Sequence, residues 1–165
     1  MKIKHLFAIL FFITGARISA DAQFSLGGGM AYRTETNGAA DNFAVQARGI
    51  YAISGPWRVG ADFNFYLDGL EYYSVWDLNL NGHCLFVNND NLKVYALAGL
   101  NYISIKYDLF MPGYDFSQSE PGFNIGVGIN LLFRPVTGFV EARAVLGKVD
   151  PLVLSAGVLF PLGGR

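Results

Sequence analysis

The sequence predicts an all-β protein, an eight-stranded antiparallel up-and-down transmembrane β-barrel. In eight segments of roughly ten residues every second side chain is apolar, and this period of two is typical of strands. The mean hydropathy of +0.31, with only 15% charged residues, is too apolar for a chain of this length in water. After residue 22 no apolar run is long enough to cross a membrane as a helix. Strands that turn one face to lipid account for all three observations.

The segment 57–68 shows the alternation most clearly. Its odd-numbered residues, from Trp57 to Leu67, are all apolar, whereas most of its even-numbered residues are polar. One face would therefore contact hydrocarbon and the other would point into the barrel. The eight predicted strands are 24–33, 42–53, 57–68, 75–87, 92–105, 122–134, 139–147 and 152–162. Eight strands enclose an interior just wide enough for side chains to fill.

The N-terminus has the layout of a cleavable secretory signal. Lys2 and Lys4 precede the apolar run 6–13, and small residues two apart follow in Ala20-Asp21-Ala22. A membrane anchor is the alternative, but the run is far shorter than the roughly 20 residues that a spanning helix needs. We expect cleavage before Gln23, so that 1–22 form the signal peptide and 23–165 a single barrel domain.

The connections between the predicted strands alternate in length. Those at 54–56, 88–91 and 135–138 are short, whereas those at 34–41, 69–74 and 106–121 are longer. Short turns of such barrels lie on the periplasmic side and long loops on the extracellular side. The last connection, 148–151, is short although it falls on the extracellular side.

The lipid-facing rows contain no charged residue. This is expected, because an Arg or Lys at the bilayer midplane would cost such a barrel about 2 to 4 kcal/mol. Aromatic rings favour the membrane interface. Trp57, Phe86, Phe133 and Phe160 are therefore predicted to form an aromatic girdle at the periplasmic interface.

The inward rows carry charges of both signs, which must compensate one another in a narrow lumen. The predicted salt-bridge network consists of Arg48, Arg58, Asp62, Asp77, His83, Glu141 and Arg143, with Lys93 on the same face. The turn at 54–56 would pair residues whose numbers sum to 110, so that Arg48 faces Asp62 and Gln46 faces Asn64. A filled, salt-bridged lumen is favoured over a gated ion path or a proton relay.

No motif for catalysis or for a cofactor stands out. His83 could act as an acid or a base, but no serine near it belongs to a nucleophile motif. The run Gly27-Gly28-Gly29 lacks the Lys and the helix of a phosphate loop, and it is better read as a close approach of strands. No metal-ligand spacing is present, and Cys84 is expected to be a small apolar side chain. We expect no enzyme, no cofactor and no metal site.

Charge argues against a nucleic-acid partner. Removing Lys2, Lys4, Arg17 and Asp21 with the signal leaves 9 basic and 12 acidic residues, a formal charge of −3 without a basic run. Proteins that bind nucleic acid carry a basic patch or stripe instead.

The connection 106–121 is the best candidate for a binding surface. Its large apolar side chains would lie on the extracellular side, where exposed aromatic groups often mark an interface. The candidate residues are Phe110, Met111, Tyr114 and Phe116. Two other interpretations stay open: the segment folds over the mouth of the barrel, or its start merely extends the fifth and sixth strands beyond the membrane.

The chain resembles the small eight-stranded outer-membrane barrels of the OmpX and OmpA-barrel type, the outer membrane protein β-barrel domain family. The resemblance covers 23–165 and rests on Gln23-Phe24 after the signal, the glycines 27–29 and the strand that ends in Phe160. It implies a protein of the cell outer membrane in contact with outer-membrane lipids, inserted by the barrel assembly machinery. A surface protein or lipopolysaccharide is a possible further partner. The family usually ends on the aromatic residue, whereas five residues follow Phe160 here.

Three functions follow from this sequence. The first is a non-enzymatic integral outer-membrane barrel with a structural or surface-interaction role, acting through its extracellular loops above a side-chain-filled lumen. The second is a narrow pore for ions or small solutes. The third is a soluble periplasmic barrel that binds a small apolar ligand, because periodicity alone does not say which face of a sheet points outward.

Overall fold

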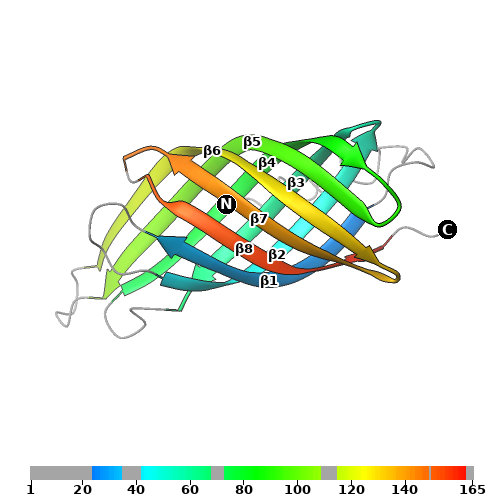
Figure 1. The fold of residues 1–165 in the computed structure, drawn as a ribbon. Helices are drawn as coiled ribbons and strands as arrows, with labels where there is room; N and C mark the ends of the chain where they lie inside the picture. Colours follow the sequence, from blue (N-terminus) through cyan, green and yellow to red (C-terminus); the bar gives the residue numbers. More distant parts are fainter. Residues whose placement is uncertain (1–23, 35–41, 68–72, 109–114, 149, 163–165) are drawn as a thin grey trace, which may run out of the picture.

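The computed structural model describes residues 24–34, 42–67, 73–108, 115–148 and 150–162, and these form one closed antiparallel barrel (Figure 1). Each strand pairs with its neighbours in sequence, and β1 closes the barrel by pairing with β8. The strands are β1 (Phe24–Thr34), β2 (Asn42–Ser54), β3 (Trp57–Tyr66), β4 (Tyr73–Asn88), β5 (Leu92–Asp108), β6 (Asp115–Phe133), β7 (Val136–Leu146) and β8 (Leu152–Pro161). The predicted fold class is confirmed. In these ranges there is no helix of the length and apolarity that a bilayer crossing requires.

The apolar rows face outward and the polar rows face the lumen. In β3, for example, Trp57 is 58% exposed, whereas Asp62 on the opposite face is 3% exposed. The same division holds along the other strands, where Leu80, Val127 and Val140 are each more than half exposed. A soluble barrel with its polar face outward is therefore wrong, because this outer surface needs hydrocarbon around it.

The short connections that follow β2, β4 and β6 lie at one end, together with the start of β1 and the end of β8 (Figure 1). The first differs from the predicted three-residue turn. Gly55 and Pro56 form a two-residue turn, with φ of 56° at Gly55, and a register shift between Ala52 and Ser54 restores the predicted pairing. Arg48 lies opposite Asp62 and Gln46 opposite Asn64, as the sum of 110 predicts.

The third short turn is also tighter than predicted. β7 begins at Val136, so only Arg134 and Pro135 connect it to β6, in place of a turn at 135–138. Thr137 and Gly138 pair with Leu132 and Leu131 because the alternation of β7 continues through them. We take this end as periplasmic, because short turns mark that side.

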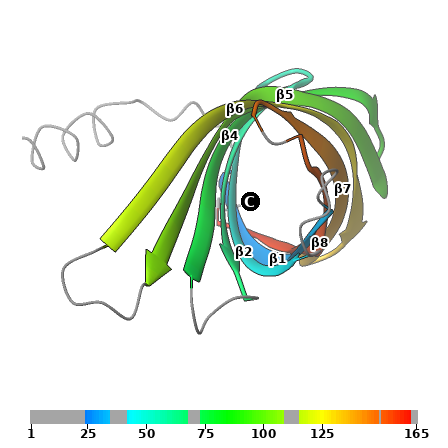
Figure 2. The same ribbon diagram turned by 90° about the vertical axis from the view of Figure 1, so that its left-hand side faces the viewer.

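At the other end, three neighbouring strands extend beyond the rest. β4, β5 and β6 contain 16, 17 and 19 residues, whereas the other five contain 10 to 13. Figure 2 shows the long strands leaning away from the barrel ring. Most of the predicted loop 106–121 is thus strand, because β5 and β6 stay paired as far as Asp108 and Asp115. The structure thus agrees with the open interpretation that the segment extends the fifth and sixth strands.

The first and last strands approach very closely. A Cβ atom placed on Gly27 or Gly29 would overlap the backbone of β8, and one placed on Gly157 would overlap the backbone of β1. Glycine at these three positions lets β1 and β8 pair from Ser25–Pro161 to Thr34–Leu152 without a steric clash.

Candidate functional site

Four buried charges close the middle of the lumen, and we call Arg48, Asp62, Glu141 and Arg143 the plug. Arg48 binds both oxygens of Glu141 through Nη1 and Nη2, at 2.9 and 2.7 Å. Arg143 Nη1 lies 2.9 Å from Asp62 Oδ1. Each of the four is at most 3% exposed. With two charges of each sign the plug is neutral, which a buried cluster requires.

The partners in the plug are not the cross-strand neighbours. Arg48 lies opposite Asp62 in the register, yet its Nη2 is 3.7 Å from Asp62 and only 2.7 Å from Glu141 on β7. Asp62 is bound instead by Arg143, which also comes from β7. Long arginine side chains thus reach across the narrow lumen, and the ion pairs connect β2 and β3 with β7.

A polar cluster lies beside the plug, centred on Asp77. Its carboxylate accepts hydrogen bonds from Asn64 Nδ2 at 2.7 Å, Tyr66 Oη at 2.6 Å and Asn79 Nδ2 at 2.5 Å. Amide side chains continue this network, since Asn101 and Asn124 both donate to Asn79 Oδ1. Hydrogen bonds in place of an ion pair therefore compensate Asp77, and they fill the cross-section next to the plug.

On the periplasmic side of the plug, Tyr95 contacts Glu141, His83 and Arg58. Tyr95 Oη donates to Glu141 Oε2 at 2.8 Å, and the His83 ring stacks on the Tyr95 ring with centroids 4.7 Å apart. The Arg58 guanidinium carbon lies 4.9 Å from the centroid of the same ring. Gly128 makes room for Tyr95, because a Cβ atom there would overlap the phenol. Within the described part of the chain no serine hydroxyl bonds His83, so the geometry offers no nucleophile and base pair.

The seven residues of the predicted network all point into the lumen and are buried, but they are not equally paired. Ion pairs join the four plug residues. Asp77 is held by hydrogen bonds, His83 stacks on Tyr95, and Arg58 forms no ion pair with any residue in the described ranges. Tyr95 was missed, although it shares the sequence parity of Lys93 and so belongs to the inward row of β5.

A polar cavity of about 870 Å³ opens on the periplasmic side of Tyr95. Arg58, Lys93 and Asn130 line its inner part, and the turns at Asn88–Asp90 and Arg134–Pro135 line its rim. A second cavity near the extracellular end holds only about 30 Å³, room for about one water molecule. The lumen is thus open to the periplasm as far as the plug and nearly filled beyond it.

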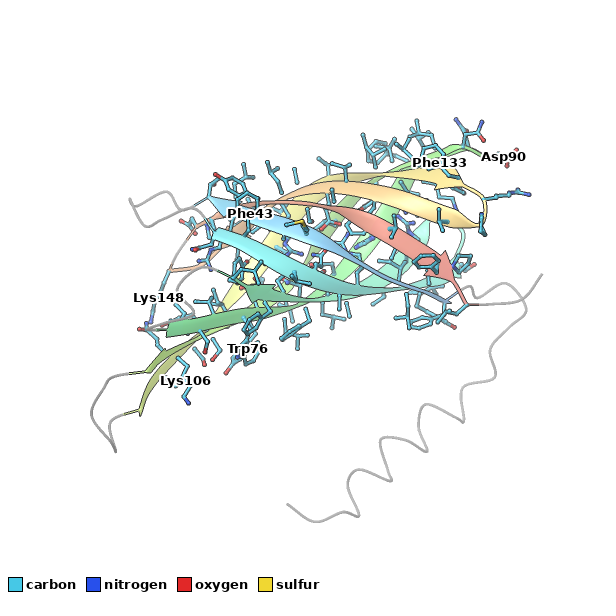
Figure 3. All side chains as sticks on the ribbon, turned by 90° about the horizontal axis from the view of Figure 1, so that it is seen from below. Phe43, Trp76, Asp90, Lys106, Phe133 and Lys148 are labelled. Carbon is cyan, nitrogen blue, oxygen red and sulfur yellow. The ribbon has the colours of Figure 1, made fainter. Side chains whose placement is uncertain are left out.

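The four predicted interface aromatics lie on the outer surface near the short turns. Trp57, Phe86, Phe133 and Phe160 are each at least half exposed, and Figure 3 shows Phe133 at the same end as Asp90. A second group toward the other end was not predicted residue by residue: Trp76 contacts Phe63 and Tyr102, with ring centroids 5.9 Å apart in both cases. Along β3, Trp57 and Phe65 are eight residues apart, about 26 Å of strand, or about 20 Å along the barrel axis at a strand tilt of about 40°, which is most of the roughly 25 Å height of an apolar membrane band.

The candidate binding residues of the 106–121 segment are only partly within the structure. Phe110, Met111 and Tyr114 lie outside the described residues. Phe116 belongs to β6, where its backbone pairs with that of Tyr107. The described strands β5 and β6 end at Asp108 and begin at Asp115, at the end opposite the periplasmic turns.

Comparison with known proteins agrees with this architecture. The family model of the outer membrane protein beta-barrel domain matches residues 6–135. The N-terminal β-barrel domain of Pseudomonas aeruginosa OprF is similar at 17% identity and a TM-score of 0.66, covering 86% of this chain and 98% of that one. Neisserial surface protein A is similar at 20% identity and a TM-score of 0.65, covering 86% and 97%.

The attachment invasion locus protein Ail of Yersinia pestis is similar at 15% identity and a TM-score of 0.61, covering 86% of this chain and 97% of that one. At these identities the solved structures establish the fold alone. No match was found among curated proteins. The family model spans 130 of the 165 residues, and the barrel turns a continuous apolar surface outward. The chain therefore belongs to the outer membrane protein β-barrel domain family and is a protein of the cell outer membrane.

Proposed function

We propose that the protein is a non-enzymatic barrel that acts as a rigid scaffold, holding an extended β-hairpin above the outer membrane for contact with lipopolysaccharide or a surface protein. The observation that carries the proposal is the contrast between the plug, which closes the lumen, and the strands β5 and β6, which extend beyond the barrel. A protein built in this way offers a surface rather than a passage.

The plug argues against transport through the lumen. An ion would have to separate the Arg48–Glu141 and Arg143–Asp62 pairs, both formed by side chains at most 3% exposed. Separating a buried pair leaves uncompensated charge, which costs about 3 to 5 kcal/mol. In planar lipid bilayers we expect no steady conductance from the wild-type protein. Discrete channels that persist in it would favour the pore instead.

The extended hairpin is a stiff element with a polar surface. β5 and β6 pair continuously from Leu92–Leu131 to Asp108–Asp115. Its exposed side chains include Lys106, Ser117 and Gln118, and a contact between Lys148 and Glu120 connects it to the β7–β8 connection. A paired hairpin loses little conformational entropy on binding, so it suits recognition of a large partner.

The test is to shorten the hairpin without changing the barrel. Ile105 and Gln118 face each other in the register, so an Asn-Gly turn can replace residues 106–117. Cells displaying the wild-type or the shortened protein are measured for retention on surfaces coated with lipopolysaccharide or with extracellular-matrix protein. We expect wild-type cells to be retained on one surface and shortened-hairpin cells to be lost from it. Equal retention of the two would refute the role of the hairpin.

The first control verifies that the shortened protein still folds into a barrel. A folded outer-membrane barrel migrates differently on a gel with and without boiling, and both proteins are expected to show this shift. Lys148→Gln, which removes a charge next to the hairpin but leaves the hairpin in place, separates loss of the hairpin from loss of its ion pair.

We also propose that residues 1–22 are removed on export and that the barrel assembly machinery inserts the mature chain. The basic and apolar N-terminus and the alternating last strand that ends in Phe160 support this. Mass spectrometry of the protein purified from outer membranes is expected to find Gln23 at its N-terminus. An intact Met1 would refute the cleavage.

A further inference from the structure

We propose that the periplasmic cavity is a binding site for a phosphate ester, held by Arg58 with Lys93 beside it. The cavity measures about 870 Å³, within the range of small-molecule sites, and it is open to the aqueous periplasm. Neither the plug nor the extracellular hairpin makes use of it.

Arg58 has a guanidinium edge that is buried and has no hydrogen-bond partner among the described residues. Its Nε and Nη2 atoms are buried and make no hydrogen bond, although the side chain lines the cavity and is only 8% exposed. These two N–H groups form the side of the guanidinium that binds two oxygens of one oxyanion at once. The guanidinium carbon lies 4.9 Å from the centroid of the Tyr95 ring, a cation–π contact that holds the group beside the cavity. Because both atoms of the edge are buried, the side chain must turn toward the cavity for this edge to contact a ligand.

The barrel does not compensate the charge of Arg58. The nearby carboxylates of Asp62 and Glu141 are engaged by Arg143 and Arg48 in a plug that is already neutral. Around the cavity, Arg58, Lys93 and Arg134 stand against the single carboxylate of Asp90, a net charge of +2. A buried charge without a partner is unfavourable, so an anion that binds from the periplasm would compensate the positive charge of the cavity. A phosphate monoester, with a charge of about −1.5 to −2 at pH 7, matches it better than a carboxylate.

Hydroxyl-bearing ligands fit the rest of the lining. Asn130 Oδ1 is buried without a hydrogen-bond donor, and Asn130 lies opposite Lys93 in the β5–β6 register. Ser25 and Thr137 add hydroxyls to the wall. A phosphate on Arg58 with a ligand hydroxyl on Asn130 satisfies both groups, as in a glycerol phosphate. The glycerol phosphate group occurs as a free monoester and also, as a diester with a single negative charge, in the headgroup of phosphatidylglycerol.

The experiment titrates the refolded barrel in octyl glucoside, a detergent without phosphate. The probes are glycerol 3-phosphate, acetate of equal ionic strength, and a short-chain phosphatidylglycerol below its micelle concentration, followed by calorimetry and by 31P NMR. We expect saturable binding of glycerol 3-phosphate or of the short-chain lipid, and none of acetate. Binding of both probes would show that the site accepts the glycerol phosphate group of free esters and of lipids. Binding of only one probe would show whether the ligand is a free ester or a lipid headgroup.

Three variants assign the site. Arg58→Gln is expected to weaken binding about ten-fold or more, because it removes charge-assisted hydrogen bonds. Arg58→Lys keeps the charge but cannot form the bidentate hydrogen bond of a guanidinium, so its affinity should lie between those of the wild-type protein and Arg58→Gln. Lys148→Gln makes the same charge change at the other end of the barrel and should bind as the wild type does. The gel-mobility shift on boiling verifies that each variant is folded.

Two results would overturn the proposal. One is the absence of saturable binding of either phosphate probe to the folded wild-type protein. The other is equal weakening by Arg58→Gln and Lys148→Gln, which would reduce the effect to overall charge. If Arg58→Gln fails to fold, Arg58→Lys and Asn130→Ala carry the test, and unchanged affinity in both would equally overturn the site.

Discussion

The plug and the periplasmic cavity contain the same kinds of side chain but treat charge in opposite ways. In the plug, Arg48 and Arg143 each bind a carboxylate at 2.7 to 2.9 Å, and the four charges cancel. In the cavity, Arg58 contacts an aromatic ring and forms no ion pair with any residue in the described ranges. The difference shows that one lumen holds charges that stabilise the barrel and a charge that is available to a ligand.

The largest expected effect comes from removing one carboxylate of the plug. Asp62→Asn leaves two buried arginines with the single carboxylate of Glu141, so the plug carries an uncompensated charge, and the free energy of unfolding should fall by about 3 to 5 kcal/mol. Urea unfolding of the protein refolded in lipid vesicles measures it. Asp90→Asn, at an exposed turn, is the control and should change stability by less than about 0.5 kcal/mol. A loss below about 1 kcal/mol for Asp62→Asn would mean that the plug is not a stabilising unit.

The next largest effect is expected from a change in packing, without a change in charge, at the boundary between the plug and the cavity. Gly128→Ala should cost about 1 to 3 kcal/mol, because the new methyl group would overlap the Tyr95 ring that lies between plug and cavity. Gly82→Ala is the matched variant, since its Cβ would meet only one atom, at 3.7 Å. Equal unfolding midpoints for the two would show that Tyr95 moves aside freely.

A smaller effect tests whether the plug acts as a set of pairs. Adding Arg143→Met to Asp62→Asn removes the charge that the first change left uncompensated. The double variant should then be more stable than the sum of the two single changes predicts, by about 1 to 2 kcal/mol. The same double-mutant cycle on Asp62 and Lys148, from opposite regions, should show no coupling. Additivity within the plug would contradict a paired network.

The smallest effect is expected in the cavity. Arg58→Gln leaves no carboxylate without its partner, so the free energy of unfolding should fall by less than about 1 kcal/mol. Arg48→Gln, the comparison in the plug, removes the two-point ion pair of Glu141 and leaves the plug with a net negative charge, so it should cost about 3 kcal/mol or more. Losses of similar size in the two variants would show that Arg58 is a structural charge after all.

The faces of the strands follow from the sequence, but the ion-pair partners do not. A period of two and one turn length fix which residues point inward and which lie opposite, as for Arg48 and Asp62. The choice of Glu141 by Arg48 depends on the width of the closed lumen and on side chains from β7, which are distant in sequence. Pairing rules for adjacent strands do not contain that information.

The ends of the strands and the cavity also could not be predicted from the alternation of apolar and polar residues. Residues 115–121 lack alternating apolar side chains and include Pro121, so they resemble a loop. β6 tolerates the proline because the β6–β7 pairing runs only from Phe133 to Phe123, which leaves an edge at Pro121. The cavity forms only where inward residues of several strands and two turns meet, so the unpartnered edge of Arg58 cannot be predicted from β3 alone.

The glycines that let β1 approach β8 have a consequence for biogenesis. Their pairing joins the two ends of the chain, for example Leu26 with Phe160, so it closes the longest loop in the molecule and is expected to form last. Until then the inserted chain is an open sheet with two edges, and each unpaired backbone group in hydrocarbon costs several kcal/mol. Gly27, Gly29 and Gly157 have no side chain that could obstruct this last pairing of strands. We therefore expect the two edges to be exposed to lipid or to another chain for a shorter time.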